Sequence, residues 1–576
     1  MLYVRGGIAA VHYTGDEAVE EINQLLQNVI DNEDEFQPWE ILVGRVAELE
    51  GGLHRNSSPD AIELLRKVYD AFLSKFPLFF GYWKKYADYE FAIGGTEAAE
   101  MVYERGVACN PTSVDLWVHF CQFRMNTCHD NVIVRELFKR AADFVCLDYQ
   151  SHPFWDKYIE FEERLGETGN LTAIYKRAAL EVSWTHQSYY DKLRVAIGSR
   201  PLEELVEQDV LASIQSAIRL EHPELAELDF DRCVRHKIDE HFYPAFGAAQ
   251  RGAASCYEYE KNIKRAYFHV AKLDEAELQN WRDYLSFQER QGDYRRTAFL
   301  YERCLVTCAL YEEFWLRYAR WMFSQNNGTT FSGQKDDNTR LIYMRASCIF
   351  VSLDEPTVRL HWARLEEKLK RPDIAEGIHE AILDVNPGNI KTIISMAGLK
   401  RRTGQNSDAI QYLEQQINAH TADISGQLVA EQARIRWQCD NDIQGARDTF
   451  QRSASRLSDS QPLWKSWLQF EMNQAAATGR DQVKNVHNMM HAQSALSPAQ
   501  KKELSQDYLA YLLECGGIDA ARDYMLLDRD INGSGATTKT EDQTKVEVDE
   551  GVDSQSGPAN GHQESVEYPS IKCQDP

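Results

Sequence analysis

One aromatic spacing recurs along this chain and limits its fold more than any other feature. In the first clear copy, Trp83 is followed by Tyr86, Tyr89 and Glu90, so the aromatic residues are three positions apart. At about 100° per residue, positions i, i+3, i+6 and i+7 lie on one face of an α-helix. Each copy therefore predicts a helix with one aromatic face that must pack against another element. The tryptophans that begin the copies are Trp83, Trp117, Trp155, Trp281, Trp315 and Trp464.

A second pattern follows the first at a nearly constant distance. An arginine, preceded two residues earlier by Tyr or Phe, lies 22 or 23 residues after the tryptophan in four copies, as in Tyr103–Arg105 and Tyr175–Arg177. Small residues after the arginine allow this second helix to approach the first closely. Two antiparallel helices per repeated unit are typical of an α-solenoid.

The combination of an aromatic first helix, an acidic residue at its end and a Tyr-x-Arg second helix resembles the half-a-TPR (HAT) repeat. This repeat is found largely in RNA-processing proteins. The tetratricopeptide repeat fits less well, because it is expected to show a Trp-Leu-Gly-Tyr pattern over 34 residues. We therefore predict an all-α chain, an α-solenoid of HAT helix pairs.

The repeat pattern and the composition divide the chain into five predicted segments. The middle of the chain lacks the tryptophan motif but keeps a helical periodicity, and the copies between residues 355 and 440 are degenerate. After residue 530 the chain holds nine Asp or Glu, three Lys or Arg and almost no large apolar residues, which is typical of disorder. The segments are 1–17 (a flexible N-terminal segment), 18–197 (an N-terminal HAT array), 198–260 (a helical connector), 261–530 (a C-terminal HAT array) and 531–576 (a disordered acidic tail).

Charge and cysteine content restrict the classes of partner and site. A formal net charge of −26 argues against sequence-independent binding of RNA or DNA, because neutralising phosphates needs Lys and Arg. Proteins, including basic ones, are the expected partners. The 12 cysteines form no CxxC pair and no cluster at zinc spacing, so no metal is expected and the thiols fit a reducing compartment. We find no signal-peptide pattern and no run of about 18–20 apolar residues, and expect a soluble intracellular chain.

Motifs of catalysis are also missing from the sequence. There is no GxxxxGK[ST], no HExxH, no GxSxG and no GxGxxG that opens a βα unit. We therefore expect neither catalysis nor a bound cofactor.

Two longer stretches are more specific than the repeat. One is Phe-Pro-Leu-Phe-Phe-Gly-Tyr-Trp-Lys-Lys-Tyr-Ala-Asp at 76–88, and the other is Ile-Lys-Arg-Ala-Tyr-Phe-His-Val at 263–270, continued by Tyr-Glu-Glu-Phe-Trp at 311–315. Both resemble the pre-mRNA-processing factor 39 family of HAT-repeat splicing factors, over most of residues 30–480. The resemblance implies a nuclear, non-catalytic scaffold that associates with the U1 small nuclear ribonucleoprotein (U1 snRNP). It also implies support of 5′ splice-site recognition or alternative splicing. In such a scaffold, RNA is contacted mainly indirectly, and the C-terminal array forms a dimer with itself or with a paralogous HAT protein.

The aromatic residues could instead be stacking platforms for RNA bases. Their helical spacing favours packing inside the repeats, because one face of each helix carries all of them. We predict as repeat-core residues Trp83, Tyr86, Trp117, Trp155, Tyr158, Trp281, Tyr284, Trp315, Tyr318 and Trp464.

Charged residues at repeat spacing have a structural and a functional interpretation. The pairs Glu90–Arg105 and Glu162–Arg177 could be catalytic, but their recurrence favours ion pairs within a repeat that fix the register of its two helices. Short basic clusters are mostly solvated. If one of them contacts a partner, we expect Lys264 and Arg265 to do so, because they belong to the more specific stretch.

Three alternatives remain open at this point. One is a HAT scaffold of another RNA-processing complex, such as mRNA 3′-end cleavage or a different spliceosomal particle. A second is a cochaperone adaptor of the tetratricopeptide type, which needs a cationic cluster for a partner's C-terminal carboxylate. A third is a direct RNA-binding protein, which the net charge disfavours.

Overall fold

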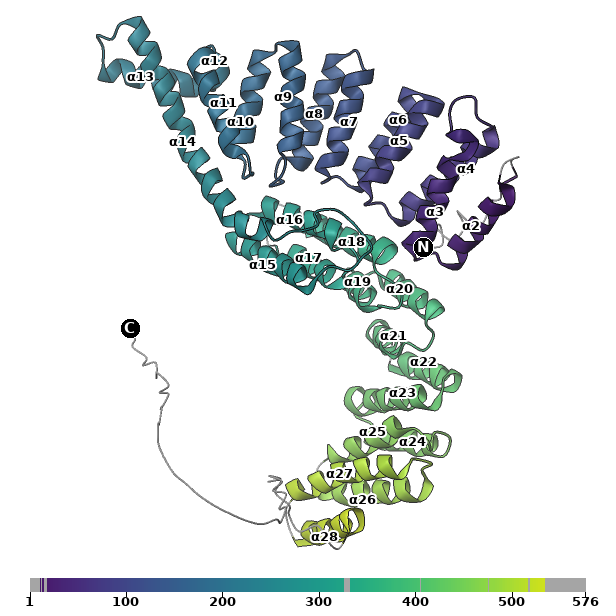
Figure 1. Cartoon of the computed structure of the whole chain (residues 1–576). Helices are drawn as coiled ribbons and strands as arrows, with labels where there is room; N and C mark the ends of the chain where they lie inside the picture. Colours follow the sequence, from purple (N-terminus) through teal and green to yellow (C-terminus); the bar gives the residue numbers. More distant parts are fainter. Residues whose placement is uncertain are drawn as a thin grey trace, which may run out of the picture. The chain divides into compact units, whose positions relative to one another are not determined.

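The computed structural model describes residues 11, 13–14, 18–325, 332–404, 406–474, 476–515 and 518–533. Every regular element in these ranges is helical, and none is a strand (Figure 1). The predicted all-α solenoid of helix pairs is confirmed. No helix in the described ranges has the length and apolarity needed to cross a membrane. The predicted tail at 531–576 lies outside the described residues apart from its first three.

The chain forms two compact units. The first contains residues 1–420 and 434–442, and the second contains residues 421–433 and 443–576. The predicted connector at 198–260 thus lies inside the first unit. The division near residue 420 lies inside the predicted C-terminal array.

The first unit begins with consecutive antiparallel helices that lie side by side (Figure 1). Of the predicted flexible segment 1–17, only Val11, Tyr13 and Thr14 are described, and Val11 and Tyr13 are buried. The helices are α2 (Val19–Asp31), α3 (Phe36–Ala47), α4 (Pro59–Lys75), α5 (Phe80–Gly94), α6 (Thr96–Cys109), α7 (Val114–Thr127), α8 (Asn131–Val145), α9 (His152–Leu165), α10 (Thr168–Leu180) and α11 (His186–Ser199).

Short polar turns separate these helices, and local chemistry sets their ends. The Ser113 hydroxyl accepts a hydrogen bond from the backbone N–H of Leu116 and so caps α7. Gly166 ends α9 at a φ of 70°, a left-handed conformation that glycine adopts at low cost. Helix starts and stops of this kind force the chain to reverse after every 12 to 17 residues of helix.

The connector contains one feature that the sequence did not predict. After α12 (Leu202–Leu205) and α13 (Gln208–Glu221), a single 34-residue helix, α14 (Glu227–Glu260), leads to the next array. It continues through Pro244. One side of α14 packs on α10 and α11, so this helix joins the two arrays of the first unit.

Helix pairs then continue to the end of the first unit. These helices are α15 (Glu275–Gln291), α16 (Tyr294–Thr307), α17 (Glu312–Ser324), α18 (Ser332–Arg345), α19 (Thr357–Lys368), α20 (Pro372–Val385), α21 (Ile390–Thr403) and α22 (Asn406–Ala419).

The second unit repeats the same hairpin architecture. Its helices are α23 (Ala422–Arg434), α24 (Ile443–Ala454), α25 (Gln461–Met472), α26 (Ala476–Gln493), α27 (Pro498–Cys515) and α28 (Ile518–Asn532).

Candidate functional site

The six motif tryptophans lie in the interior, with at most 2% of each side chain exposed. Four of the indole N–H groups donate to the carbonyl oxygen six residues upstream: Trp83 to Pro77 and Trp117 to Pro111, both at 2.8 Å, Trp315 to Ala309 at 2.7 Å, and Trp464 to Ser458 at 3.2 Å. Each of these indoles therefore packs inside its hairpin and also holds the preceding turn by a hydrogen bond. These rings are not available for stacking on RNA bases.

The tyrosines that lie three residues after the motif tryptophan stack on aromatic rings of the preceding repeat. The Tyr86 ring lies 4.9 Å from Tyr69 at 17°, and the Tyr158 ring lies 4.7 Å from Phe138 at 6°. Stacked rings of this kind add roughly 0.5–1.5 kcal/mol beyond the area they bury. The same contact joins Tyr284 to Tyr259 and Tyr318 to Tyr301.

The predicted ion pairs within a repeat are wrong, because the carboxylates pair between repeats. Glu90, 4% exposed, accepts hydrogen bonds from Arg66 at 2.7 and 2.9 Å, and Glu162, 0% exposed, accepts two from Arg135 at 2.6 and 3.0 Å. Each arginine lies on the second helix of the preceding repeat. Stacking of successive repeats brings this helix alongside the carboxylate. Arg105 and Arg177, the predicted partners, bind other carboxylates.

Arg105 and Arg177 are also engaged across repeats. The Arg105 guanidinium donates to Asp70 at 2.8 Å and lies 5.5 Å from the centre of the Trp83 ring. Arg177 similarly donates to Asp143 at 2.8 Å and lies 5.9 Å from the Trp155 ring. These arginines cover the outer face of their own tryptophans and link each repeat to the previous one.

We call the buried ion pair between successive repeats, Glu90–Arg66 or Glu162–Arg135, the clasp. One repeat carries the clasp with its charges exchanged. The position of Glu90, seven residues after the motif tryptophan, is occupied by Arg124 in the next repeat. The position of Arg66, three residues before the second-helix aromatic, is occupied there by Glu100, and Arg124 and Glu100 form an ion pair. The complementarity of the two positions is thus retained although both residue types differ.

A buried charge cluster joins the two arrays of the first unit. Arg303 on α16 donates to Glu260, the last residue of α14, at 2.9 Å and lies 3.2 Å from Asp148 in the turn between α8 and α9. The Tyr284 hydroxyl donates to Glu260 at 2.9 Å. Burial raises the pKa of Asp148 against the pull of Arg303, and it also raises the pKa of Tyr284. One guanidinium between two carboxylates fixes the N-terminal array against α14 and α16.

A second contact between the arrays involves the stretch between α14 and α15. The Phe268 ring, 2% exposed, packs edge-on against Phe79 with centroids 4.9 Å apart. The predicted partner contacts lie in the same stretch: Lys264 pairs with Asp274 at 3.0 Å, and Arg265 donates to the carbonyl of Ala271 at 2.9 Å. Arg265 therefore holds its own turn, while the Lys264 ammonium remains exposed.

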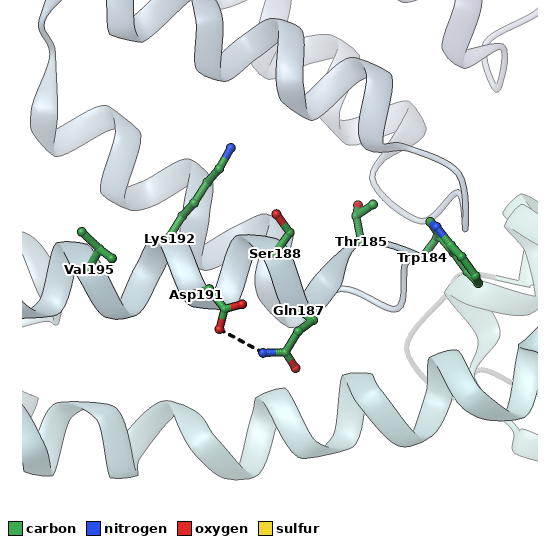
Figure 2. Close-up of a pocket in the computed structure, with 7 residues that line it drawn as sticks. All are labelled: Trp184, Thr185, Gln187, Ser188, Asp191, Lys192 and Val195. Carbon is green, nitrogen blue, oxygen red and sulfur yellow. Dashed lines mark hydrogen bonds between the residues drawn. The ribbon is translucent and has the colours of Figure 1, made fainter.

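The surface of the first unit is hollowed beside α11 over about 660 Å³. Figure 2 shows Lys192 and Ser188 on one side of α11, and Asp191 and Gln187 on the other, joined by a hydrogen bond of 3.0 Å. At one end lies Trp184, which is 55% exposed and stacks on Tyr257 at 5.7 Å. The hollow is open and lined by exposed side chains, which suits contact with a partner's side chains. In the described ranges, no three His, Cys, Asp or Glu residues gather as metal ligands do.

The sequence matches known proteins along both arrays. Residues 23–194 match the family described as PRP39 N-terminal HAT repeat, and residues 254–402 match the one described as PRP39 C-terminal HAT repeat. Pre-mRNA-processing factor 39 of Schizosaccharomyces pombe is 40% identical over 525 residues, which cover 87% of this chain and 85% of that protein. The chain belongs to the pre-mRNA-processing factor 39 family.

More distant relatives show how far the similarity extends. The human pre-mRNA-processing factor 39 is 26% identical over 85% of this family member and 75% of its own length. The U1 small nuclear ribonucleoprotein component PRP42 of Saccharomyces cerevisiae is 21% identical over 53% of this chain and 59% of its own. The crystal structure of CSTF-77 superposes with a TM-score of 0.53 over 82% of this chain and 92% of that one, at 10% identity, and so shares the fold.

The structure of this family member also contains a repeat that lacks the aromatic spacing and was not predicted from the sequence. Trp39 on α3 is fully buried and donates to the carbonyl of Glu33, six residues upstream, at 2.9 Å. Aliphatic residues, Leu42 and Val46, replace the aromatic and acidic partners of the motif. Trp39, followed along the chain by Arg66 and Tyr69, was the sequence pattern that could have indicated this repeat.

Proposed function

We propose that this chain is a non-catalytic scaffold of pre-mRNA splicing that associates with the U1 snRNP in the nucleus and supports 5′ splice-site recognition or alternative splicing. The observation that carries this proposal is family membership, with 40% identity across 85% of the fission yeast pre-mRNA-processing factor 39. The similarity to a protein named as a U1 snRNP component supports the choice of particle.

The geometry supports a scaffold in two ways. The repeats bury their aromatic residues and leave long helix surfaces for partners, as solenoids do. The clasps between repeats and the charge cluster at Arg303 hold the first unit together, so partners bound to different helices keep a defined spacing.

The contact between His487 and Ser505 has the residue types of a catalytic pair, but its surroundings support a structural role. His487 Nε2 lies 2.9 Å from the Ser505 hydroxyl, but the two side chains are 5% and 0% exposed. Ser505 donates its proton to the carbonyl of Lys501 at 2.7 Å, so the histidine is a donor to the serine and not its base.

A purification experiment tests the proposed function. The tagged full chain should enrich U1 RNA and U1 proteins over the other spliceosomal particles when it is purified from nuclear extract. It should shift the assembled particle in electrophoresis but not U1 RNA alone, because the chain is acidic. Enrichment of a 3′-end cleavage complex, or a shift of naked RNA at the same concentration, contradicts the proposal.

Self-association through the C-terminal array, with itself or with a paralogous HAT protein, is a further part of the proposal. The last described helix, α28, exposes 80% of Ile518 and 71% of Met525, seven residues apart and therefore on one face. In a solenoid this is the face on which another repeat would stack.

Sedimentation of the full chain tests this part. The wild type should sediment as a dimer, and Ile518→Glu with Met525→Glu should sediment as a monomer. A matched control is Met101→Glu on α6, where the side chain is 69% exposed, and it should stay dimeric. A wild-type chain that is monomeric at high micromolar concentration contradicts self-association.

Lys264 and Arg265 remain proposed partner contacts, with the larger role assigned to Lys264. Lys264→Glu should weaken binding of the U1 particle, because it places a negative charge at an exposed site. Asp274→Asn breaks the same internal ion pair but keeps the cation, so it should bind like the wild type. Equal binding of both variants contradicts a role for Lys264.

A further inference from the structure

The hairpin between α13 and α14 contributes little to the repeat packing. It lies in the stretch without the tryptophan motif and forms a corner next to α12 (Figure 1). Only Leu211 and Ile218 of α13 are buried, and α14 buries nothing before Val234. Residues 219–231, which we call the acidic tip, therefore contribute little to the core.

Two leucines of the acidic tip are nevertheless exposed to solvent. Leu220 is 86% exposed, the highest value for a large hydrophobic side chain in the described ranges, and Leu228 is 67% exposed. Phe230 nearby is half-buried and covered by the Arg219 guanidinium, 4.9 Å from the ring centre. Large apolar side chains exposed to solvent among charged residues are typical of a contact with another protein.

The charge of the acidic tip is strongly one-sided. From Leu220 to Asp231 the chain has five Asp or Glu residues and no Lys or Arg, so Arg219 is the one Lys or Arg of the acidic tip. Asp229 and Asp231 pair with Arg232 and Arg235, which follow in α14. A negative charge at the start of a helix is favourable, which accounts for Glu227 and Asp229 but not for the rest.

The remaining glutamates keep their charge unneutralised. Glu221 and Glu224 form no ion pair in the described part of the chain, and Lys237, a cation near Glu221, is paired with Glu240 at 3.0 Å. The acidic tip thus presents two exposed leucines among free carboxylates.

We propose that the acidic tip docks into an apolar cleft rimmed by Lys and Arg on a basic protein of the U1 particle. Charge complementarity selects this occupant, because burying the leucines next to a positive rim removes them from water and pairs the free carboxylates. An RNA backbone is repelled by the same carboxylates. The inference rests on the proposed function and adds the site and the chemistry of the partner.

The test measures the affinity of the immobilised full chain for purified U1 particle. Leu220→Ser with Leu228→Ser should weaken binding at least tenfold, and Glu221→Lys with Glu224→Lys should do so at low salt, with a smaller effect at high salt. All of these side chains are exposed, so circular dichroism and the melting temperature should not change. The matched control is Met101→Ser with Val132→Ser, at positions 69% and 61% exposed on α6 and α8, and it should bind like the wild type.

Different outcomes identify different failures. A wild type that binds the particle together with leucine variants that bind equally well overturns the inference and leaves the proposed function intact. A wild type that does not bind overturns both. Loss of dimerisation in the leucine variants also overturns the inference, because the acidic tip would then contact a second copy of the chain.

Discussion

Two groups of repeats join their consecutive helices by different contacts. In the N-terminal array, an aromatic ring on the second helix stacks on the next repeat, as Phe138 does on Tyr158 at 4.7 Å and 6°. From α20 to α21 and from α26 to α27, a histidine bonds to a serine instead. His379 lies 2.9 Å from Ser395, and His487 lies 2.9 Å from Ser505.

The HAT hairpin can therefore use either stacked rings or a hydrogen bond between histidine and serine at this contact. The two kinds of contact should differ in their response to pH. Stacked rings do not titrate in the physiological range. A buried histidine is stable only while it is neutral, and burial lowers the pKa of His379 and lowers that of His487 to about 4. The aromatic repeats should therefore be insensitive to mild acid, and the histidine repeats should not.

The largest expected effect comes from removing a buried indole. Trp117→Ala should reduce the stability of the N-terminal array by about 3–5 kcal/mol, because it removes the ring and leaves a cavity. Hydrogen exchange of α7 and α8 measures the loss locally. Trp184→Ala, at a site 55% exposed, is the control and should change little. Equal effects of the two substitutions would remove the special role of the buried tryptophans.

Acid should separate the two groups of repeats. An unfolded histidine has a pKa of about 6.5, so the unfolded chain binds the proton first as the pH falls. The stability contributed by neutral His487 is then complete above pH 6.5, is lost between pH 6.5 and about 4, and amounts to about 3 kcal/mol.

Hydrogen exchange of α26 and α27 over this pH range measures the loss, with α8 and α9 as the internal reference. His487→Gln should make the profile of α26 and α27 less steep, while His491, which also contacts Ser505 and whose pKa burial also lowers, keeps part of the acid sensitivity. A profile that is unchanged by this substitution would show that other groups cause the acid sensitivity.

The clasp between repeats should have an intermediate effect. Glu162→Gln leaves Arg135, which is 18% exposed, without its anion and should cost about 2 kcal/mol. The partly exposed pair Arg402–Glu367 provides the comparison, and Glu367→Gln should cost less than about 1 kcal/mol.

The reversed pair Glu100–Arg124 suggests a sharper control for the clasp. Arg135→Glu combined with Glu162→Arg should recover part of the stability that either substitution alone removes. Thermal melting of the three variants measures the coupling. If the double variant loses as much stability as the two single variants together, charge complementarity is not what this position requires.

The smallest effect is expected at an exposed pair within one helix. Lys84 and Asp88 are 2.6 Å apart, with side chains 41% and 53% exposed. Asp88→Asn should change the melting temperature by an amount that corresponds to about 0.3–0.5 kcal/mol or less. A larger loss would show that surface charges on the aromatic helices matter as much as the buried clasp.

The repeat architecture could be predicted because it depends on local periodicity. The spacing of Trp83, Tyr86 and Glu90 alone defines one face of a helix, and the fixed distance to Arg105 defines a hairpin. The partner of Glu90 could not be predicted in this way. Two arginines, Arg66 and Arg105, lie at plausible distances along the chain, and only the stacking of successive repeats decides between them.

Contacts between the two arrays could not be predicted from the periodicity of the sequence. Phe79 and Phe268 come from distant parts of the sequence, and nothing local indicates that their rings touch. The same holds for Asp148 and Arg303. The leucines of the acidic tip are visible in the sequence, but the exposure of Leu220 depends on how α13 and α14 pack.

The charge cluster of Asp148, Glu260 and Arg303 has a consequence for how this family can vary in length. Its three members come from widely separated positions, and each must arrive at the same buried point. Adding or deleting a helix pair between residues 148 and 303 would move one of them away and leave an unpaired charge in the interior. Length differences among relatives are therefore expected in the turns and near the two ends of the chain, while the number of helices across this interval stays constant.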